Sequence, residues 1–285
     1  MQSLQGILPA IVTPLDEHGD LNTPVFESLI VHMYEAGVDG LYVCGNTGEG
    51  MQLPTSLREK ATELAIRNSP AGKQVIIHVG AYRQEEARQL ARHASRLGAA
   101  AVSSLPPGPQ YNFAETKSWY EAIAKDASVP FLVYHFPSLS QPMSLDQLED
   151  LCTISGVVGL KFTSFDLYSL RQLVSAGHTV FNGHDEVLAP GLLMGAHGGI
   201  GSTYNLMPGL FVQLYKQATT GQWQEAIATQ DLINKQIRIL LRYPLIPAIK
   251  QVLAWRGVDC GHAVQPRLGL SIEQQTELRV KMESL

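Results

Sequence analysis

Eight short apolar runs, each followed by a stretch with helical periodicity, recur over residues 1–220 of the chain. The unit repeats about every 30 residues, the length that a strand, a helix and a return to a parallel strand require. The runs are apolar on both faces, as parallel strands are when helices cover one face and a packed interior the other. The expected strands are residues 6–13, 40–44, 74–79, 100–103, 130–134, 157–161, 179–182 and 198–201.

This order predicts an α/β fold, a closed (β/α)8 TIM barrel. The alternative is an open doubly wound sheet, which binds nucleotides through a glycine-rich turn. We disfavour it because no expected strand is followed by G-x-G-x-x-G or a Walker loop, and GGIGST has glycines without that spacing. Gly221 marks a break, after which helices are expected over residues 222–241, 244–256 and 271–285. We therefore predict a barrel over residues 1–220 and a C-terminal helical appendage over residues 221–285, packed on the barrel.

The charge and hydropathy of the chain disfavour several classes of binding partner. A formal net charge of −5 gives no basis for binding nucleic acid or an anionic membrane. No apolar run approaches the roughly 18 residues that span a bilayer, and the stretch MQSLQGILPA lacks the pattern of a signal peptide. Cys44, Cys152 and Cys260 have neither disulfide nor zinc spacing, which indicates a reducing compartment and predicts a cytoplasmic protein.

Lys161 is the unusual lysine, because it directly follows the buried apolar run at 157–160. Burial of an ammonium lowers its pKa, and a neutral amine can attack a ketone to form a Schiff base. The alternative is a lysine that extends from a strand end into solvent. The other lysines lie in polar or helix-surface contexts, and we expect Lys250, in IPAIKQVL, to occupy one position of an amphipathic helix.

Reactive groups of a barrel gather where its strands end. The loop GNTGEG, at 45–50, exposes consecutive N–H groups that could bind a carboxylate, with the Thr47 hydroxyl as a further donor. The alternative is a turn in which Glu49 is an early helix charge. The other strand ends supply Tyr134, His135, Thr163, Gly183, His184, Asp185, Glu186, Ser202, Thr203 and Tyr204.

Strand alternation places His135 on the face opposite Tyr134, so we interpret it as structural. His184 lies on a loop from which it could touch a substrate. Asp185 and Glu186 are either charges at a helix N-terminus or acceptors for a polyol. No HxH, HExxH or GxSxG motif is present, so neither a metal centre nor a serine hydrolase is predicted.

Three motifs at these strand ends resemble the class I, Schiff-base aldolase family that contains dihydrodipicolinate synthase and N-acetylneuraminate lyase. GNTGEG is similar to the family's G-x-T-[TS/G]-E loop, VYHFP to its tyrosine strand, and GLKFT to the strand of its imine-forming lysine. The resemblance covers nearly the whole chain. It implies Lys161 as the imine lysine, Tyr134 as the proton-relaying phenol, and Asn46 with Thr47 as the site of the pyruvyl carboxylate.

The other end of the predicted site is similar to the sialic acid lyase branch of this family, through NGHDE and GGIGSTYN. The implied reaction is cleavage of N-acetylneuraminate (sialic acid) to pyruvate and N-acetylmannosamine, by a homotetramer that needs no cofactor. Two departures are an asparagine, Asn46, where the family has serine or threonine, and a poorly matching loop PPGPQYN. From this loop Tyr111 would be the tyrosine offered by a neighbouring subunit. The residues that would bind the sugar hydroxyls are Thr163, Gly183, Asp185, Glu186 and Ser202.

Other functions remain open on the same residues. An aldolase or dehydratase of another 2-keto-3-deoxy sugar acid, such as 2-keto-3-deoxygluconate, would use the same lysine and tyrosine. Dihydrodipicolinate synthases carry an arginine shortly after the tyrosine, and HFPSLSQ has none, which counts against that activity. A barrel kept as a binding protein, with Lys161 unreactive, is the non-enzymatic alternative.

Overall fold

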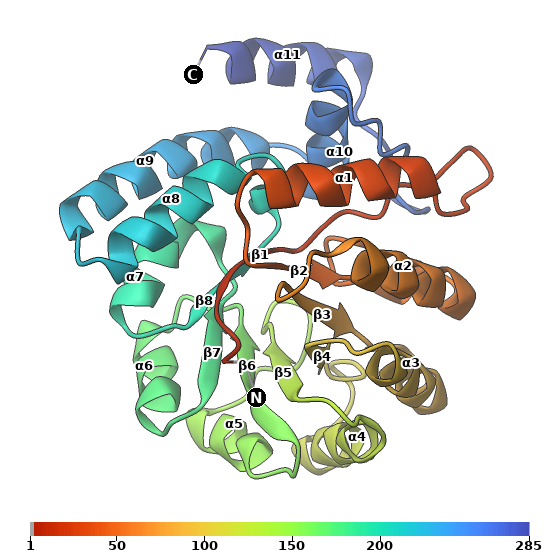
Figure 1. The fold of residues 1–285 in the computed structure, drawn as a ribbon, viewed down its shortest axis with the longest axis vertical. Coiled ribbons are helices and arrows are strands. Elements are labelled where there is room, and N and C mark those ends of the chain that lie inside the picture. The colour runs from red at the N-terminus through yellow and green to blue at the C-terminus, as the bar shows by residue number, and fades with distance from the viewer. Residues whose placement is uncertain (1–2, 285) are drawn as a thin grey trace.

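Eight parallel strands form one sheet that closes on itself in the computed structural model, which describes residues 3–284 (Figure 1). Neighbouring strands follow the order β1-β8-β7-β6-β5-β4-β3-β2. A parallel bridge between Ala10 and Tyr42, with the Ile11 N–H donating to the Tyr42 carbonyl at 3.1 Å, joins β1 to β2. The predicted (β/α)8 barrel is confirmed. Its strands are β1 (Gly6–Pro9), β2 (Gly40–Val43), β3 (Gln74–His78), β4 (Ala101–Ser104), β5 (Phe131–His135), β6 (Val157–Phe162), β7 (Thr179–Asn182) and β8 (Gly198–Gly201).

Helices surround the barrel, as Figure 1 shows. Local sequence fixes several helix starts. Asn112 with Glu115 and Ser144 with Gln147 form reciprocal capping boxes at α4 and α5, which satisfy otherwise unpaired backbone N–H groups. The helices are α1 (Thr23–Glu35), α2 (Thr55–Asn68), α3 (Gln84–Arg96), α4 (Phe113–Asp126), α5 (Leu145–Cys152), α6 (Leu167–Ser175), α7 (Leu188–Leu193) and α8 (Pro208–Thr219).

The buried apolar side chains fall into two clusters. The larger one fills the space between the strands and the helices around them. The smaller one fills the barrel interior and includes Leu8, Tyr42, Ile76, Tyr134 and Phe181. The barrel is therefore a packed core, and a ligand can enter only at the ends of the strands.

Two expected boundaries differ from the structure. The strand predicted over residues 6–13 ends at Pro9, and beyond the Ala10 bridge the chain leaves the sheet. The possible helix N-terminus at Asp185 and Glu186 is a 3-10 turn, Asp185–Val187, and the chain becomes α-helical only at Leu188. This turn arises because the Asp185 carboxylate accepts hydrogen bonds from Thr203 instead of capping the helix.

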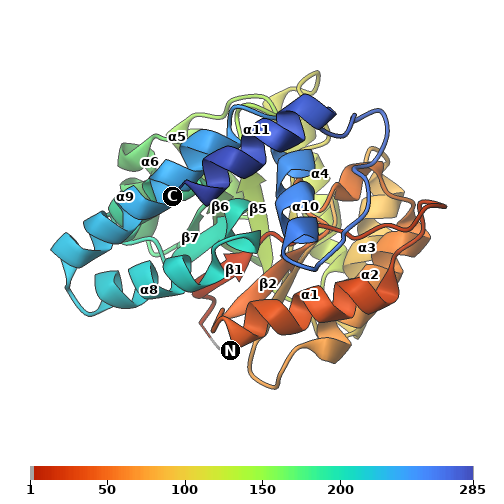
Figure 2. The ribbon, with the colours of Figure 1, turned by 90° about the horizontal axis from the view of Figure 1, so that it is seen from above.

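Three further helices follow the barrel: α9 (Trp223–Leu240), α10 (Leu245–Trp255) and α11 (Ile272–Glu283). Helix α9 lies beside α8 in both views of the ribbon (Figures 1 and 2), and α11 crosses near α9 and α10 (Figure 2). The last helix was expected to reach Leu285, which lies outside the described residues. Within residues 3–284, no helix has the length and hydropathy of a membrane span.

Candidate active site

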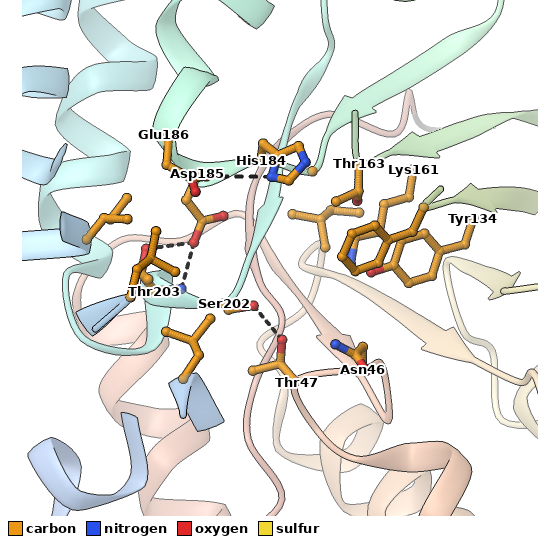
Figure 3. A pocket seen from close by; sticks show the side chains of 16 residues that line it. Asn46, Thr47, Tyr134, Lys161, Thr163, His184, Asp185, Glu186, Ser202 and Thr203 are labelled. Atoms are coloured by element: carbon orange, nitrogen blue, oxygen red, sulfur yellow. Dashed lines mark hydrogen bonds and ion pairs between the residues drawn. The ribbon is translucent and has the colours of Figure 1, made fainter. Parts of the chain in front are cut away.

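A cavity of about 210 Å³ lies at the carboxyl ends of the strands (Figure 3). It brings together all the predicted site residues except Tyr111. Lys161, Tyr134 and Thr163 lie on one side, and Asp185 and Glu186 on the opposite side. The lining residues are Asn46, Thr47, Tyr134, Phe136, Lys161, Thr163, Gly183, His184, Asp185, Glu186, Ile200, Ser202, Thr203, Ile237, Leu241 and Leu245.

Lys161 is the penultimate residue of β6, and its register partner on β5 is Tyr134. Only 4% of its surface is exposed. The Nζ atom lies 4.1 Å from the centre of the Tyr134 ring and 4.3 Å from that of Tyr42. Among residues 3–284 it forms no ion pair with an acidic side chain. The side chain therefore points into the cavity without a fixed counter-ion, as imine chemistry requires.

Burial lowers the pKa of Lys161 to about 7, and the carboxylate of Asp185 opposes part of that shift. The amine is thus neutral in a large fraction of molecules at neutral pH. An ordinary surface lysine, with a pKa near 10.4, would be almost entirely charged at that pH.

Tyr134 is held by an aromatic cluster inside the barrel. Its ring stacks on Phe136, with centroids 6.0 Å apart, and meets Tyr42 and His78 edge-on. Burial raises the pKa of the Tyr134 phenol well above its ordinary value. The phenol is therefore protonated at rest and suited to relay a proton.

His78, on β3, packs edge-on against Tyr134 with ring centroids 6.0 Å apart and was not identified from the sequence. Its Nε2 atom accepts the Leu105 N–H at 3.1 Å, so its proton is on Nδ1, which donates to the Cys44 carbonyl at 3.1 Å. Burial lowers the pKa of His78 well below its ordinary value. The imidazole is consequently neutral and adds no second positive charge near Lys161.

The loop after β2 has the geometry of an anion site. Cys44 and Glu49, at its two ends, adopt left-handed backbone conformations with φ of 57° and 55°, which produces a sharp turn. The N–H groups of Asn46 and Thr47 donate no hydrogen bond within residues 3–284. The Thr47 hydroxyl bonds that of Ser202 at 2.7 Å. Two residues that line the cavity therefore have unpaired N–H donors, and binding of a carboxylate by this loop stays a prediction.

Glu49 and Lys250 form a buried ion pair that the sequence did not predict. Lys250 lies on a helix, α10, as expected. Glu49 is fully buried, and its Oε2 atom lies 3.3 Å from Lys250 Nζ on α10. Its Oε1 atom accepts from Arg267 Nη1 at 3.1 Å and from the Val264 N–H at 2.9 Å. Lys250 also donates to the His262 carbonyl at 2.7 Å. A buried carboxylate needs such partners, and they come from a distant part of the chain.

The Asp185 carboxylate is only partly free. Its Oδ2 atom accepts the Thr203 N–H at 2.7 Å and the Thr203 hydroxyl at 2.6 Å. Burial raises the pKa of Asp185 to about 6 despite these bonds. Glycine at 201 allows the approach, since a Cβ there would lie 1.9 Å from Asp185 Oδ1. Glu186 lies 3.7 Å from His184 Nδ1.

Thr163 places a hydroxyl beside the Tyr134 phenol, whose pKa it lowers against the effect of burial. Its Oγ1 atom is buried and has no hydrogen-bond partner among the described residues. Glycine at 183 makes room for it, because a Cβ there would lie 2.0 Å from Thr163 Oγ1. A buried hydroxyl without a well-formed hydrogen bond is costly, so this atom can bond either the Tyr134 phenol or a ligand in the cavity.

The remaining candidates divide clearly. His135 stacks on Phe162 outside the cavity, as its strand position predicted. His184 lines the cavity and stacks on Phe165, with ring centroids 4.0 Å apart. Tyr111 does not line the cavity of its own chain, and its contribution to a neighbouring subunit stays a prediction.

Sequence reasoning also missed an apolar wall of the cavity. Ile237 and Leu241 come from α9 and the residue after it, and Leu245 begins α10. Helical periodicity marks such residues as apolar but does not tell which tertiary surface they cover. The C-terminal helices are thus part of the cavity itself.

Known proteins resemble this chain over most of its length. The model of the Dihydrodipicolinate synthetase family matches residues 3–285. N-acetylneuraminate lyases of Escherichia coli (strain SMS-3-5 / SECEC) and Rhizobium meliloti (strain 1021) are 37% and 34% identical, over 90% and 92% of this chain and 88% and 89% of theirs. A Clostridium difficile structure in complex with mannosamine superposes with a TM-score of 0.94 at 29% identity, covering 99% of both chains. The family predicted from the motifs is confirmed, and the chain belongs to the dihydrodipicolinate synthetase family.

Proposed function

We propose that this protein is a class I aldolase that cleaves N-acetylneuraminate to pyruvate and N-acetylmannosamine. One observation carries the proposal: a single cavity joins a buried lysine, which forms no ion pair within residues 3–284, to a carboxylate pair on the opposite wall. The lysine suits a 2-keto acid, and the carboxylates suit a polyol. The similarity to two N-acetylneuraminate lyases supports the same substrate.

In the proposed reaction, the neutral amine of Lys161 attacks C2 of the open-chain substrate. Loss of water gives a protonated imine, which accepts the electron pair when the C3–C4 bond breaks. The C4 hydroxyl proton leaves through Tyr134, and C4 becomes the aldehyde of N-acetylmannosamine. Protonation of the enamine at C3 and hydrolysis of the imine then release pyruvate and restore the amine.

The loop residues Asn46 and Thr47 would bind the substrate carboxylate through their free N–H groups. The Thr47 hydroxyl, which bonds that of Ser202, would relay the proton between the substrate carboxylate and Tyr134. Asp185, Glu186, Thr163 and Ser202, with Gly183, would hold the sugar hydroxyls and determine specificity.

The test of this function is a panel of 2-keto acids assayed for pyruvate release, with N-acetylneuraminate expected to turn over best. Markedly faster release from 2-keto-3-deoxygluconate would instead favour an aldolase for that class of sugar acid. Borohydride reduction in the presence of pyruvate, followed by peptide mass analysis, should locate the adduct on Lys161. A protein that forms no adduct and releases no pyruvate would be the non-enzymatic barrel.

We further propose a cytoplasmic homotetramer, in which Tyr111 reaches the site of a neighbouring subunit. The three cysteines are buried free thiols, which supports a reducing compartment. Light scattering at working concentration tests the assembly. Replacement of Tyr111 by phenylalanine should lower cleavage only where the oligomer is intact.

A further inference from the structure

Both ends of the cavity contact the C-terminal helices, through different residues. One end is the 45–50 loop, which we expect to bind the substrate carboxylate, and the other contains Asp185 and Glu186. At the end expected to bind the substrate carboxylate, Glu49 lies two residues after Thr47, which lines the cavity. Its side chain is fixed by Lys250 on α10 and by Val264 and Arg267 in the segment before α11. The contacts of this buried charge cluster therefore set the position of the loop.

At the end of the cavity that contains Asp185 and Glu186, the contact with the C-terminal helices is made by Gln230 on α9. Gln230 is 5% exposed, and its Nε2 atom donates to the Asp185 carbonyl at 3.0 Å. Its Oε1 atom accepts the Ala189 N–H at 2.9 Å. One helical turn on, Asn234 donates to the Glu186 carbonyl at 3.1 Å.

Each of these two sets of contacts acts on one end of the cavity. Within residues 3–284, no hydrogen bond or ion pair of the Glu49, Lys250 or Arg267 side chains reaches residues 185–189. Likewise, no side-chain hydrogen bond of Gln230 reaches residues 45–50. The 45–50 loop has only short turn bonds of its own, and residues 185–187 form a single 3-10 turn. Side-chain contacts with other elements therefore help to determine where their ligand-binding groups lie. A small displacement of such groups is enough to impair catalysis.

We propose that Lys250 and Gln230 are positioning residues for two separate halves of the substrate: Lys250 for the 2-keto acid carboxylate, and Gln230 for the polyol. Neither residue lines the catalytic cavity. The proposal rests on the proposed aldolase function. It assigns the C-terminal segment a role in substrate recognition beyond covering the barrel.

Two near-isosteric variants, Lys250→Met and Gln230→Met, test recognition of the two halves of the substrate separately. The first assay is borohydride trapping on Lys161 as a function of pyruvate concentration, and the second is KM and kcat for N-acetylneuraminate. Lys250→Met should raise the pyruvate concentration for half-maximal trapping about tenfold. Gln230→Met should leave that concentration within about twofold of wild type while raising KM for N-acetylneuraminate about tenfold.

Controls distinguish positioning from loss of stability. Leu278→Ala removes a fully buried leucine of α11 and should lower Tm without altering either assay. Lys250→Arg keeps the charge and should restore pyruvate trapping toward wild type. If Lys250→Met does not fold, Arg267→Met removes the more exposed partner of Glu49 and should weaken trapping in the same direction.

The proposal is overturned if Lys250→Met traps pyruvate as wild type does, or if both methionine variants change both assays equally. A wild-type protein that traps no pyruvate would instead refute the aldolase function itself. A wild type that traps pyruvate but does not cleave N-acetylneuraminate would refute only the substrate, and the Lys250 arm would still be decided.

Discussion

Lys161 and Lys250 are both almost fully buried, with 4% and 3% of their surfaces exposed, yet they have opposite surroundings. Lys161 faces two aromatic rings in a cavity. Lys250 lies 3.3 Å from a buried carboxylate and donates to a backbone carbonyl. Burial lowers the pKa of both, but for Lys250 the ion pair with Glu49 opposes the shift. Burial alone therefore does not make a nucleophile; the absence of a counter-ion and access to a cavity are also needed.

The largest expected effect comes from replacing the unpaired lysine. Lys161→Met should lower cleavage of N-acetylneuraminate by about 10⁴-fold or more, because no other group can form the imine. Lys250→Met, the matched replacement of the other buried lysine, should retain turnover at saturating substrate. Steady-state kinetics with circular dichroism checks both. Retained turnover by a folded Lys161→Met protein would contradict the imine role.

The two lysines also differ in what sequence could reveal. Lys161 was predicted because an apolar strand ends at it, which is a local signal. Lys250 looked like an ordinary position of an amphipathic helix, because its partner Glu49 lies on a distant loop. The related contact from Val264 to Glu49 joins residues 215 positions apart. A single sequence contains no information on such pairs until the fold is known.

The same distinction applies to the fold and the rest of the site. Barrel strands and the motif residues at their ends were predictable, because period and strand termini are local properties. The apolar wall from Leu241 and Leu245, the neutral imidazole of His78 behind Tyr134 and the contact of Gln230 with Asp185 were not. Their roles depend on tertiary contacts between segments that look ordinary in isolation.

Stability should respond in the opposite order from activity. Lys250→Met leaves Glu49 buried with only Arg267 as a charged partner, and should lower the free energy of unfolding by about 3 kcal/mol. Chemical denaturation at neutral pH measures this loss. As a control, Lys117→Met removes a more exposed ion pair with Asp150 and should change stability by less than about 1 kcal/mol. Equal losses of unfolding free energy would show that the buried ion pair stabilises the protein no more than the exposed one.

Lys161→Met should instead stabilise the protein at low pH, by about 2 kcal/mol. Below pH 7 the amine is protonated in both states, so the cost of burying its charge is fully present. Between pH 7 and 10.5 the unfolded state binds the proton and the folded state does not, so wild-type stability rises with pH. The advantage of the variant should therefore shrink from pH 6 to pH 9 in denaturation experiments. An advantage independent of pH would contradict the lowered pKa.

The pH dependence of imine formation offers a more direct measure of the same group. Because Lys161 has a pKa of about 7, the initial rate of borohydride trapping with pyruvate should fall about tenfold for each pH unit below that value. Quenched-flow trapping between pH 5 and 9 gives the midpoint. A midpoint near that of an ordinary lysine would mean that the amine is solvated in solution.

The smallest expected effect comes from the one carboxylate that acts on Lys161 across the cavity. Asp185 opposes the lowering of the lysine pKa by burial, so Asp185→Asn should move the trapping midpoint to lower pH, by less than about one unit. Asparagine keeps an oxygen that can still accept from Thr203, so the loop should stay in place. Glu186→Gln is the matched control and should leave the midpoint unchanged, since Glu186 is not among the groups that shift Lys161. A shift to higher pH, or equal shifts in both variants, would mean that Asp185 does not set the charge of the amine. The ion pair with Glu49 would then be what distinguishes Lys250 from Lys161.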